Sequence, residues 1–205
     1  MNSLLSTDIF EIDKIHNAKA MQLVFNVLRS RVGSPTSYQS ISEDVGVSPT
    51  TIKKYVQILE ALFIIFTVHP YSKNIARSLL KEPKIYFYDT GLVQGDDGAK
   101  FENFVAVSLL KHVYGKVDIK AEDYALYYLR TKDSQEVDFA VVSQDKIETM
   151  IEVKYSDRTP SKTLIKFHEK YNYPAIQLVN SLRNDYQQQG VRILKAEKFL
   201  SQLFL

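Results

Sequence analysis

The sequence of 205 residues contains no cysteine. This absence excludes disulfide frameworks, thiolate zinc sites and cysteine nucleophiles, so any bound metal must be held by oxygen or imidazole ligands. The four histidines, His16, His69, His112 and His168, are scattered along the chain, and none shows the spacing of a metal-ligand pair. Oxygen donors are therefore the ligands that we expect at a metal site.

Long apolar runs and a phosphate-binding loop are missing as well. No apolar run approaches the roughly 20 residues of a membrane-spanning helix. The N-terminus carries Asp8, Glu11 and Asp13 and lacks the basic and apolar regions of a signal peptide. We therefore expect a cytoplasmic protein with no membrane partner. Because no glycine-rich loop of the Walker type occurs, no ATPase activity is expected from this chain.

A strong excess of basic charge is also absent. The formal net charge is +2, with 10 basic and 8 acidic residues in positions 1–90 and 16 of each in positions 91–205. Proteins that bind nucleic acid by neutralising phosphates usually show a clearer basic excess. Any binding of DNA is therefore expected to be local and modest.

Helical patterns fill the first part of the chain. Apolar residues at helical spacing predict three helices, over residues 17–32, 37–46 and 48–65. A short helix, a tight turn at Gly46 and a longer helix that begins at Ser48 and Pro49 are typical of a helix-turn-helix. Two β-rich runs, 63–68 and 84–89, then predict a hairpin. Together these elements predict a winged helix.

This winged-helix domain is predicted to span residues 1–90, including an N-terminal lead segment. After Met1, the segment 1–13 contains five apolar side chains, Leu4, Leu5, Ile9, Phe10 and Ile12. About ten residues bury too little surface to offset an ordering cost of roughly 1 to 2 kcal/mol each. We therefore expect this segment to be loosely ordered or to dock on a neighbouring copy, as in a homo-oligomer.

Polar residues at the start of the third helix have side chains that can reach phosphates. They are Ser48, Thr50, Thr51, Lys53 and Lys54. Their position on a recognition helix predicts contact with DNA. The apolar stretch from Ile58 to Phe66 favours an alternative, in which the winged helix packs against a neighbouring domain. The sequence leaves both hypotheses open.

A second domain, 98–205, is predicted after the glycine-containing stretch 90–100. The expected elements are a helix over 101–115 that ends at Gly115, strands over 125–131, 136–143 and 146–156, a helix opening at Pro160, strands over 175–180 and 191–197, and a closing helix. The order is α-β-β-β-α-β with an appended strand. The whole chain is therefore predicted to be of the α+β or α/β class.

Three charged residues fall inside apolar strands, where charge is costly unless it is paired or metal-bound. They are Asp138, Glu152 and Lys154. Because side chains alternate along a strand, Glu152 and Lys154 share a face. A three-residue loop, 144–146, would bring Asp138 beside Glu152, whereas a two-residue loop would misplace Asp138.

Two carboxylates and a lysine on one strand face suit metal-dependent cleavage of a phosphodiester. Asp138 and Glu152 are the predicted ligands of Mg²⁺ or Mn²⁺, which prefer oxygen donors. Lys154 can orient a metal-bound water or neutralise the transition state. Glu102, near the start of the preceding helix, is expected to add a ligand through a water or to tune the site. Four residues, Asp138, Glu152, Lys154 and Glu102, thus form the predicted catalytic set.

A flanking phosphate also has a predicted binding place. Arg130 and Lys132 are two residues apart and so share a face on the strand before Asp138. Tyrosines including Tyr127, Tyr171 and Tyr173 can stack on bases, although such rings more often line a core or its rim.

The acidic strands, the Glu102 helix and the element order resemble the PD-(D/E)XK nuclease superfamily, and they imply its restriction-endonuclease-like fold. The segments VSPTTIKKYVQILEALFII, KIYFYDTGL, FENFVA, YYLRTKDSQEVDFAVV and IEVKYS also resemble the C-terminal half of a prokaryotic family of AAA-type ATPases. That region is catalogued as a domain of unknown function. The resemblance covers about residues 8–180. It implies an ATPase module as a partner, in cis or in trans, although that module is absent from this chain.

Two functions follow from these observations. The first is a magnesium-dependent DNA nuclease whose winged helix positions the substrate. The alternative is a non-catalytic DNA- or protein-binding regulatory region of an AAA-type ATPase. Binding of a divalent metal by Asp138 and Glu152 is what separates them.

Overall fold

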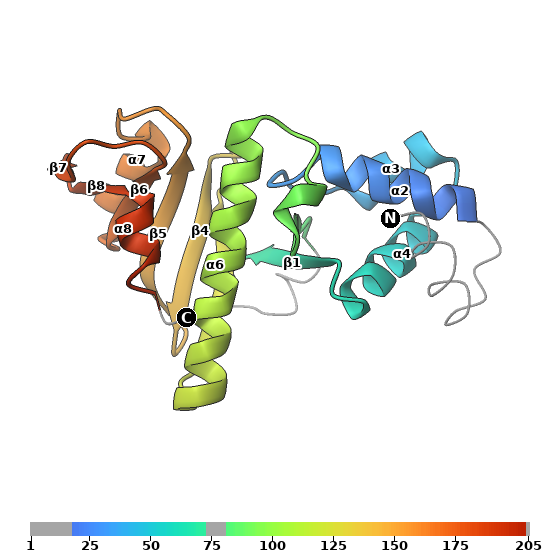
Figure 1. Cartoon of the computed structure of the whole chain (residues 1–205), viewed down its shortest axis with the longest axis horizontal. Helices are drawn as coiled ribbons and strands as arrows, with labels where there is room; N and C mark the ends of the chain where they lie inside the picture. The colour runs from blue at the N-terminus through green and yellow to red at the C-terminus, as the bar shows by residue number, and fades with distance from the viewer. Residues whose placement is uncertain (1–17, 73–80, 204–205) are drawn as a thin grey trace.

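The computed structural model describes residues 18–72 and 81–203, so the lead segment 1–13 lies outside the described residues. The chain forms a mixed α+β structure built on one eight-stranded sheet (Figure 1). Helices lie on both faces of the sheet, and three further helices pack at one end of it. The predicted mixture of helices and strands is confirmed.

Three helices begin the described chain: α2 (Ala18–Ser30), α3 (Tyr38–Val45) and α4 (Pro49–Ala61). Gly46 ends α3 in the left-handed region at a φ of 78°, which glycine adopts without strain. The Ser48 side chain caps α4 by accepting a hydrogen bond from the Thr51 amide, and Pro49 occupies the first turn. The expected turn and cap are confirmed. The designation of this unit as a winged helix stays a prediction.

The sheet continues from the N-terminal hairpin into the rest of the chain. Its strands are β1 (Ile65–Pro70), β2 (Lys84–Phe87), β3 (Tyr124–Arg130), β4 (Glu136–Ser143), β5 (Lys146–Lys154), β6 (Ala175–Val179), β7 (Tyr186–Gln188) and β8 (Val191–Lys195). They lie in the order β2-β1-β3-β4-β5-β6-β8-β7. Because the end of β1 pairs in parallel with β3, the sheet crosses the predicted boundary between residues 90 and 98. The division into two domains stays a prediction.

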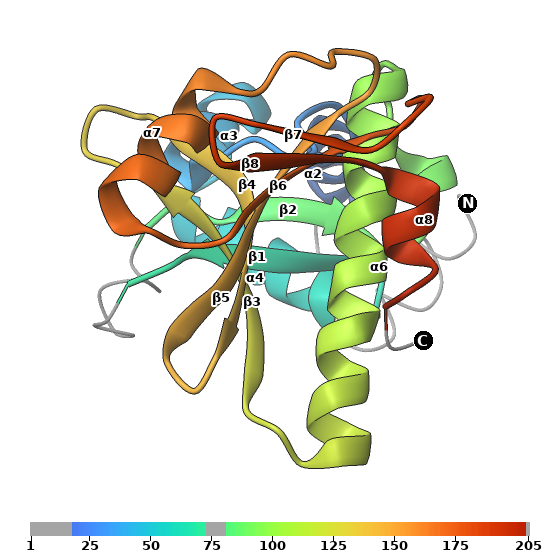
Figure 2. The same ribbon diagram turned by 90° about the vertical axis from the view of Figure 1, so that its left-hand side faces the viewer.

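Two helices cover opposite faces of the sheet. The long helix α6 (Asp97–Lys120) lies on one face and α7 (Lys162–Tyr171) on the other, as Figures 1 and 2 both show. The short helix α8 (Ala196–Leu200) contributes Ala196 and Leu200 to the α6 side. On the α7 side, Leu164 and Phe167 pack against a second, smaller apolar cluster. Each face of the sheet therefore has its own core.

The predicted end of one helix was wrong, and one strand was not predicted. The helix predicted over 101–115 runs through Gly115 to Lys120, where Ala121 ends it in the left-handed region. A glycine inside a helix costs only about 1 kcal/mol relative to alanine. Burial of Val113 on the same helix offsets that cost. Strand β7 was not predicted because its residues, Tyr-Gln-Gln, are exposed and show no apolar alternation.

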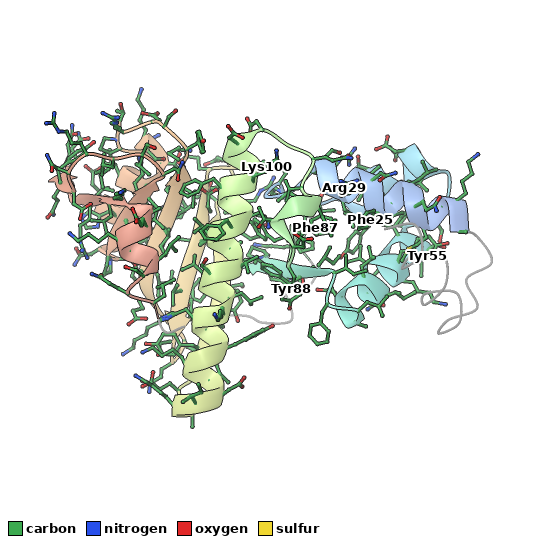
Figure 3. All side chains as sticks on the ribbon, in the orientation of Figure 1. Phe25, Arg29, Tyr55, Phe87, Tyr88 and Lys100 are labelled. Carbon is green, nitrogen blue, oxygen red and sulfur yellow. The ribbon has the colours of Figure 1, made fainter. Side chains whose placement is uncertain are left out.

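Helix α6 is fastened to the N-terminal half by a buried asparagine. Asn103 accepts a hydrogen bond from the Phe87 amide and donates to the Phe87 carbonyl and the Thr90 hydroxyl. The rings of Phe25 and Phe87 meet edge to face at 5.8 Å between the helices and the hairpin (Figure 3). Arg29 donates to the Leu92 carbonyl on the same side. These contacts fix strand β2 beside the start of α6, where Glu102 lies.

Candidate functional site

The turn between β4 and β5 sets the register of the acidic strands. It has two residues, Gln144 and Asp145, both at positive φ, so the predicted three-residue loop was wrong. A bulge after the turn adds one residue to β5, and beyond it Phe139 pairs with Ile151. Continued by one residue, this register sets position 138 opposite position 152. The register that the site requires is thus reached through a bulge and not through the loop.

Glu152 and Lys154, which the sequence predicts to share a strand face, form an ion pair. Glu152 Oε1 lies 2.9 Å from Lys154 Nζ, and the Glu152 side chain is only 8% exposed, whereas that of Lys154 is 37% exposed. Glu152 Oε2 is buried and has no hydrogen-bond partner. Burial favours the neutral form of Lys154, but the carboxylates of Glu152, Asp138 and Glu102 together outweigh this effect and raise its pKa. One carboxylate oxygen of this ion pair therefore remains buried without a hydrogen-bond partner.

Asp138 lies where strands β4 and β5 stop pairing. Its Oδ2 accepts a hydrogen bond of 2.9 Å from the Val153 amide, and its Oδ1 lies 3.2 Å from Lys84 Nζ. Next to Glu152 on the other side is Gln177 of β6, which is fully buried. Its amide binds the loop before α7 through the Ser161 amide and the Thr159 carbonyl. Neighbouring strands thus hold both acidic residues in place.

A buried lysine that the sequence analysis missed lies among the acidic residues. The side chain of Lys84 is 3% exposed, and its ammonium lies 3.2 Å from Asp138, 3.8 Å from Glu102 and 3.9 Å from Glu136. It also lies 5.5 Å from the centre of the Tyr128 ring. Lys84 comes from strand β2 of the N-terminal hairpin. The site is therefore completed by a cation from the other half of the chain.

Glu102 is held beside this lysine by two further contacts. The Tyr86 hydroxyl donates a hydrogen bond of 2.8 Å to Glu102 Oε1. Gly33, at a φ of 75°, lies so close that a Cβ there would be 2.5 Å from the same oxygen. The left-handed backbone favours glycine at position 33, and a side chain there would displace the Glu102 carboxylate. The structure brings Glu102, Asp138, Glu152 and Lys154 together, as predicted.

The buried carboxylates have unusual proton affinities. Burial, together with the nearby Asp138, raises the pKa of Glu102 to about 8. Burial and the same aspartate raise the pKa of Glu152 to about 7. For Lys84, burial favours the neutral form, but the three carboxylates outweigh it and raise the pKa above its ordinary value. The cluster therefore holds more negative charge than Lys84 alone balances.

The predicted phosphate-binding and DNA-binding residues lie apart from this cluster or at its edge. Arg130 forms an ion pair of 3.1 Å with Glu136, which links it to the Lys84 cluster, and Lys132 is exposed on the turn after β3. On α4, Thr50, Lys53 and Lys54 are exposed, as is Ser48. The Ser48 hydroxyl caps the helix by accepting from the Thr51 amide, and it lies 2.9 Å from the Thr51 hydroxyl.

Several residues of the site were missed by sequence reasoning, namely Lys84, Tyr86, Glu136 and Gly33. A signal existed for the first, because a lysine opens the apolar run KIYFYD. Glu136 stands two residues before Asp138, the spacing that places two side chains on one face of a regular strand. No signal in the sequence showed that strand β2 would reach Asp138.

The described residues contain neither a ready-made group of metal ligands nor a membrane-spanning helix. In residues 18–72 and 81–203, no group of three or more histidine, cysteine, aspartate or glutamate side chains is arranged to hold a metal ion by itself. No helix in the described part of the chain combines the length and the apolar character that crossing a membrane requires.

Comparison with known proteins finds a family model that matches each half of the chain. Residues 1–98 match a domain of unknown function, DUF8612, and residues 97–199 match a domain of unknown function, DUF4143. The second match covers 103 of the 205 residues. The chain belongs to the DUF4143 family. Members of this family are commonly found with AAA ATPases, which supports that part of the resemblance noted in the sequence.

The DUF4143 chain is similar to longer proteins. It is 25% identical to an uncharacterised protein of Haemophilus influenzae over 98% of its own length and 50% of the relative. An uncharacterised protein of Mycobacterium tuberculosis is 25% identical over 69% of the chain and 33% of the relative. The chain thus spans a third to a half of the curated relatives that it matches.

One solved structure also matches, a complex of Thermococcus gammatolerans McrB AAA+ hexamers with bound McrC. The sequence identity is 13%, and the match covers 87% of this chain and 50% of that one. Its TM-score of 0.30 is too low to support a conclusion about the fold.

Stability should depend on pH through the buried glutamates. In metal-free buffer, we expect the free energy of unfolding to fall as the pH rises from 4.5 toward 8, because the folded state holds a proton on Glu152 up to a pKa of about 7 and on Glu102 up to a pKa of about 8. Each such group contributes a slope of about 1.4 kcal/mol per pH unit. Urea unfolding of Glu102→Gln should show a flatter profile. The exposed Glu122→Gln should retain the parent profile, and a parent profile that rises over this range would contradict the assignment.

Loss of the buried lysine should be costly where the carboxylates are charged. Lys84→Met leaves an unbalanced buried charge, which typically costs about 3 to 5 kcal/mol. We expect urea unfolding to show a loss of this size at pH 8 and a smaller one at pH 5, where the glutamates are protonated. Lys81→Met, an exposed lysine nearby, is the control. An equal loss at both pH values would mean that packing, and not charge, explains the effect.

Proposed function

We propose that this chain carries a metal-dependent phosphodiesterase site of the nuclease type, and that DNA is its substrate. The observation that carries the proposal is the unpartnered, buried Oε2 of Glu152 beside Asp138 and Lys154. A buried carboxylate oxygen without a hydrogen bond is costly, and an ion or ordered water is its usual partner. The resemblance to PD-(D/E)XK nucleases supports the same residues in the same roles.

The donor set suits a hard divalent cation. Asp138 and Glu152 would hold it, and both offer only oxygen. Mg²⁺ is commonly bound by one or two carboxylates together with waters and substrate phosphates, so a third acidic side chain is not required. When bound, such an ion supplies a water of lowered pKa and neutralises charge on the phosphate.

The protein side chains would then divide the remaining work. Lys154 is the more exposed member of its pair, so an approaching phosphate meets its ammonium before it meets Glu152. That ammonium can orient the attacking water or stabilise charge that develops on the phosphate. Glu102, through its raised pKa, can hold a proton near neutral pH. The exposed polar residues at the start of α4 would contact the DNA backbone away from the site.

A second candidate function is a non-catalytic binding region that works with an AAA-type ATPase. One observation favours it: both carboxylate oxygens of Asp138 are engaged, one by Lys84 and the other by the Val153 amide. An internal ammonium can satisfy acidic residues in place of a metal. The frequent occurrence of DUF4143 with AAA ATPases supports such a partner. In this function the same residues stabilise the fold and cut nothing.

Cleavage of DNA in Mg²⁺ or Mn²⁺ separates the two candidates. We expect Asp138→Asn, Glu152→Gln and Lys154→Met each to reduce the cleavage rate by at least about 100-fold, the scale of losing one preorganised electrostatic group. Glu148 is an exposed glutamate on β5, the strand of Glu152 and Lys154, so Glu148→Gln should leave the rate unchanged. A parent protein that cuts neither single- nor double-stranded DNA with any divalent metal would favour the binding function.

A further inference from the structure

A groove on the α7 side of the sheet has a chemistry of its own. It measures about 990 Å³ and lies between the β3–β4 turn and helix α7. Its floor includes the apolar residues Leu129, Ile147 and Phe167, which belong to the smaller core. Glu102, Asp138, Glu152 and Lys154 do not line the groove, so it is distinct from the acidic site.

Tyrosine rings form the walls of this groove. Tyr171 and Tyr173 lie nearly parallel, with ring centres 6.1 Å apart and an angle of 19° between them. Tyr71 meets Tyr127 edge to face beside them. Tyr173 and Tyr71 pack partly on the core, whereas Tyr171 is 43% exposed. Flat aromatic surface is thus presented to the solvent at a fixed position.

Basic side chains surround the rings. The groove is lined by four cationic residues, Arg130, Lys132, Lys166 and Lys170. Only two acidic residues, Asp133 and Glu169, share the lining. The three lysines are exposed, and Lys170 lies 5.1 Å from the centre of the Tyr171 ring. Arg130 is held by Glu136 and Glu82, so the positive charge that the groove offers a ligand comes from the three lysines, which outnumber the two acidic lining residues.

We propose that this groove binds single-stranded nucleic acid, with bases stacked on Tyr171 and Tyr173 and phosphates on the surrounding lysines. Stacking on aromatic rings within a positively charged groove is the usual chemistry of such binding. A duplex does not fit this chemistry, because its bases are already stacked on each other. A strand of single-stranded DNA and one of RNA share the features that the groove would recognise.

The groove is connected to the acidic site by a chain of ion pairs. Arg130 at the groove lies 3.1 Å from Glu136, which lies 3.9 Å from Lys84, which in turn lies 3.2 Å from Asp138. A strand in the groove would thus hold its neighbouring phosphates near the proposed cleavage site. Single-stranded DNA would then be the form of substrate that the site cleaves, and this part of the proposal rests on the proposed function. Binding in the groove itself requires neither a metal nor cleavage.

Fluorescence anisotropy with labelled strands of about 12 thymidines or 12 uridines tests the inference, since binding sites of this type take roughly 4 to 16 nucleotides. The measurement uses the full chain in EDTA, so that cleavage plays no part. We expect the parent to bind a single strand of either sugar more tightly than the matching duplex. We expect Tyr171→Ala with Tyr173→Ala to raise the Kd at least about tenfold, given the value of stacking per base.

Further variants distinguish stacking from loss of the fold. Tyr171→Phe should retain binding because it keeps the ring, and Tyr114→Ala, an exposed tyrosine on α6, should have no effect. Lys166→Ala with Lys170→Ala should lower the slope of log Kd against log salt by about 0.7 for each lysine. These lysines are exposed and their replacement leaves the core intact.

The outcomes separate this inference from the proposed function. Tight binding in EDTA without any cleavage in Mg²⁺ or Mn²⁺ would support the groove and contradict the nuclease. If the parent cleaves DNA but its tyrosine and lysine variants bind single strands as tightly as the parent does, the groove proposal is contradicted and the proposed nuclease is not. Binding of neither single strand by the parent would overturn it as well.

Discussion

The buried ammonium of Lys84 is the contact on which the rest of the structure depends. It joins a hairpin of the N-terminal half to three carboxylates of the C-terminal half, Glu102, Asp138 and Glu136. Without it, that many acidic groups could not stay ionised in so small a volume at neutral pH, because buried like charges repel strongly. The continuous sheet and the Asn103 hydrogen bonds position strand β2 for this contact. The two halves therefore share one site.

This arrangement gives the acidic cluster two ways to be neutralised. One is internal, through Lys84 and through protons on glutamates of raised pKa. The other is an external cation at Asp138 and Glu152, where one carboxylate oxygen still lacks a partner. The proposed nuclease and the proposed binding region differ in which of these the protein uses. Both accounts rest on the same residues, so the balance between internal and external cations decides the function.

The sequence contained most of the elements and the central residues of the site, but not their geometry. Helical and strand periodicity located nearly every element, and charges inside apolar strands identified Asp138, Glu152 and Lys154. The turn length was wrong because a bulge in β5 supplies the extra residue, and bulges leave no clear pattern in sequence. Lys84 and Gly33 were missed because their roles depend on pairing between distant segments. Tertiary contacts of this kind cannot be read from local periodicity.

The most direct test of the account is a calorimetric titration of the metal-free chain with Mn²⁺. We expect the parent to bind one ion and Asp138→Asn to bind none. We also expect folded Lys84→Met to bind the ion more tightly than the parent, because the internal cation no longer competes for Asp138. Binding should also strengthen as the pH rises above 7, where Glu152 loses its proton. A parent chain that binds no Mn²⁺, or that binds it equally well after Asp138→Asn, would contradict the assignment of a metal site to Asp138 and Glu152.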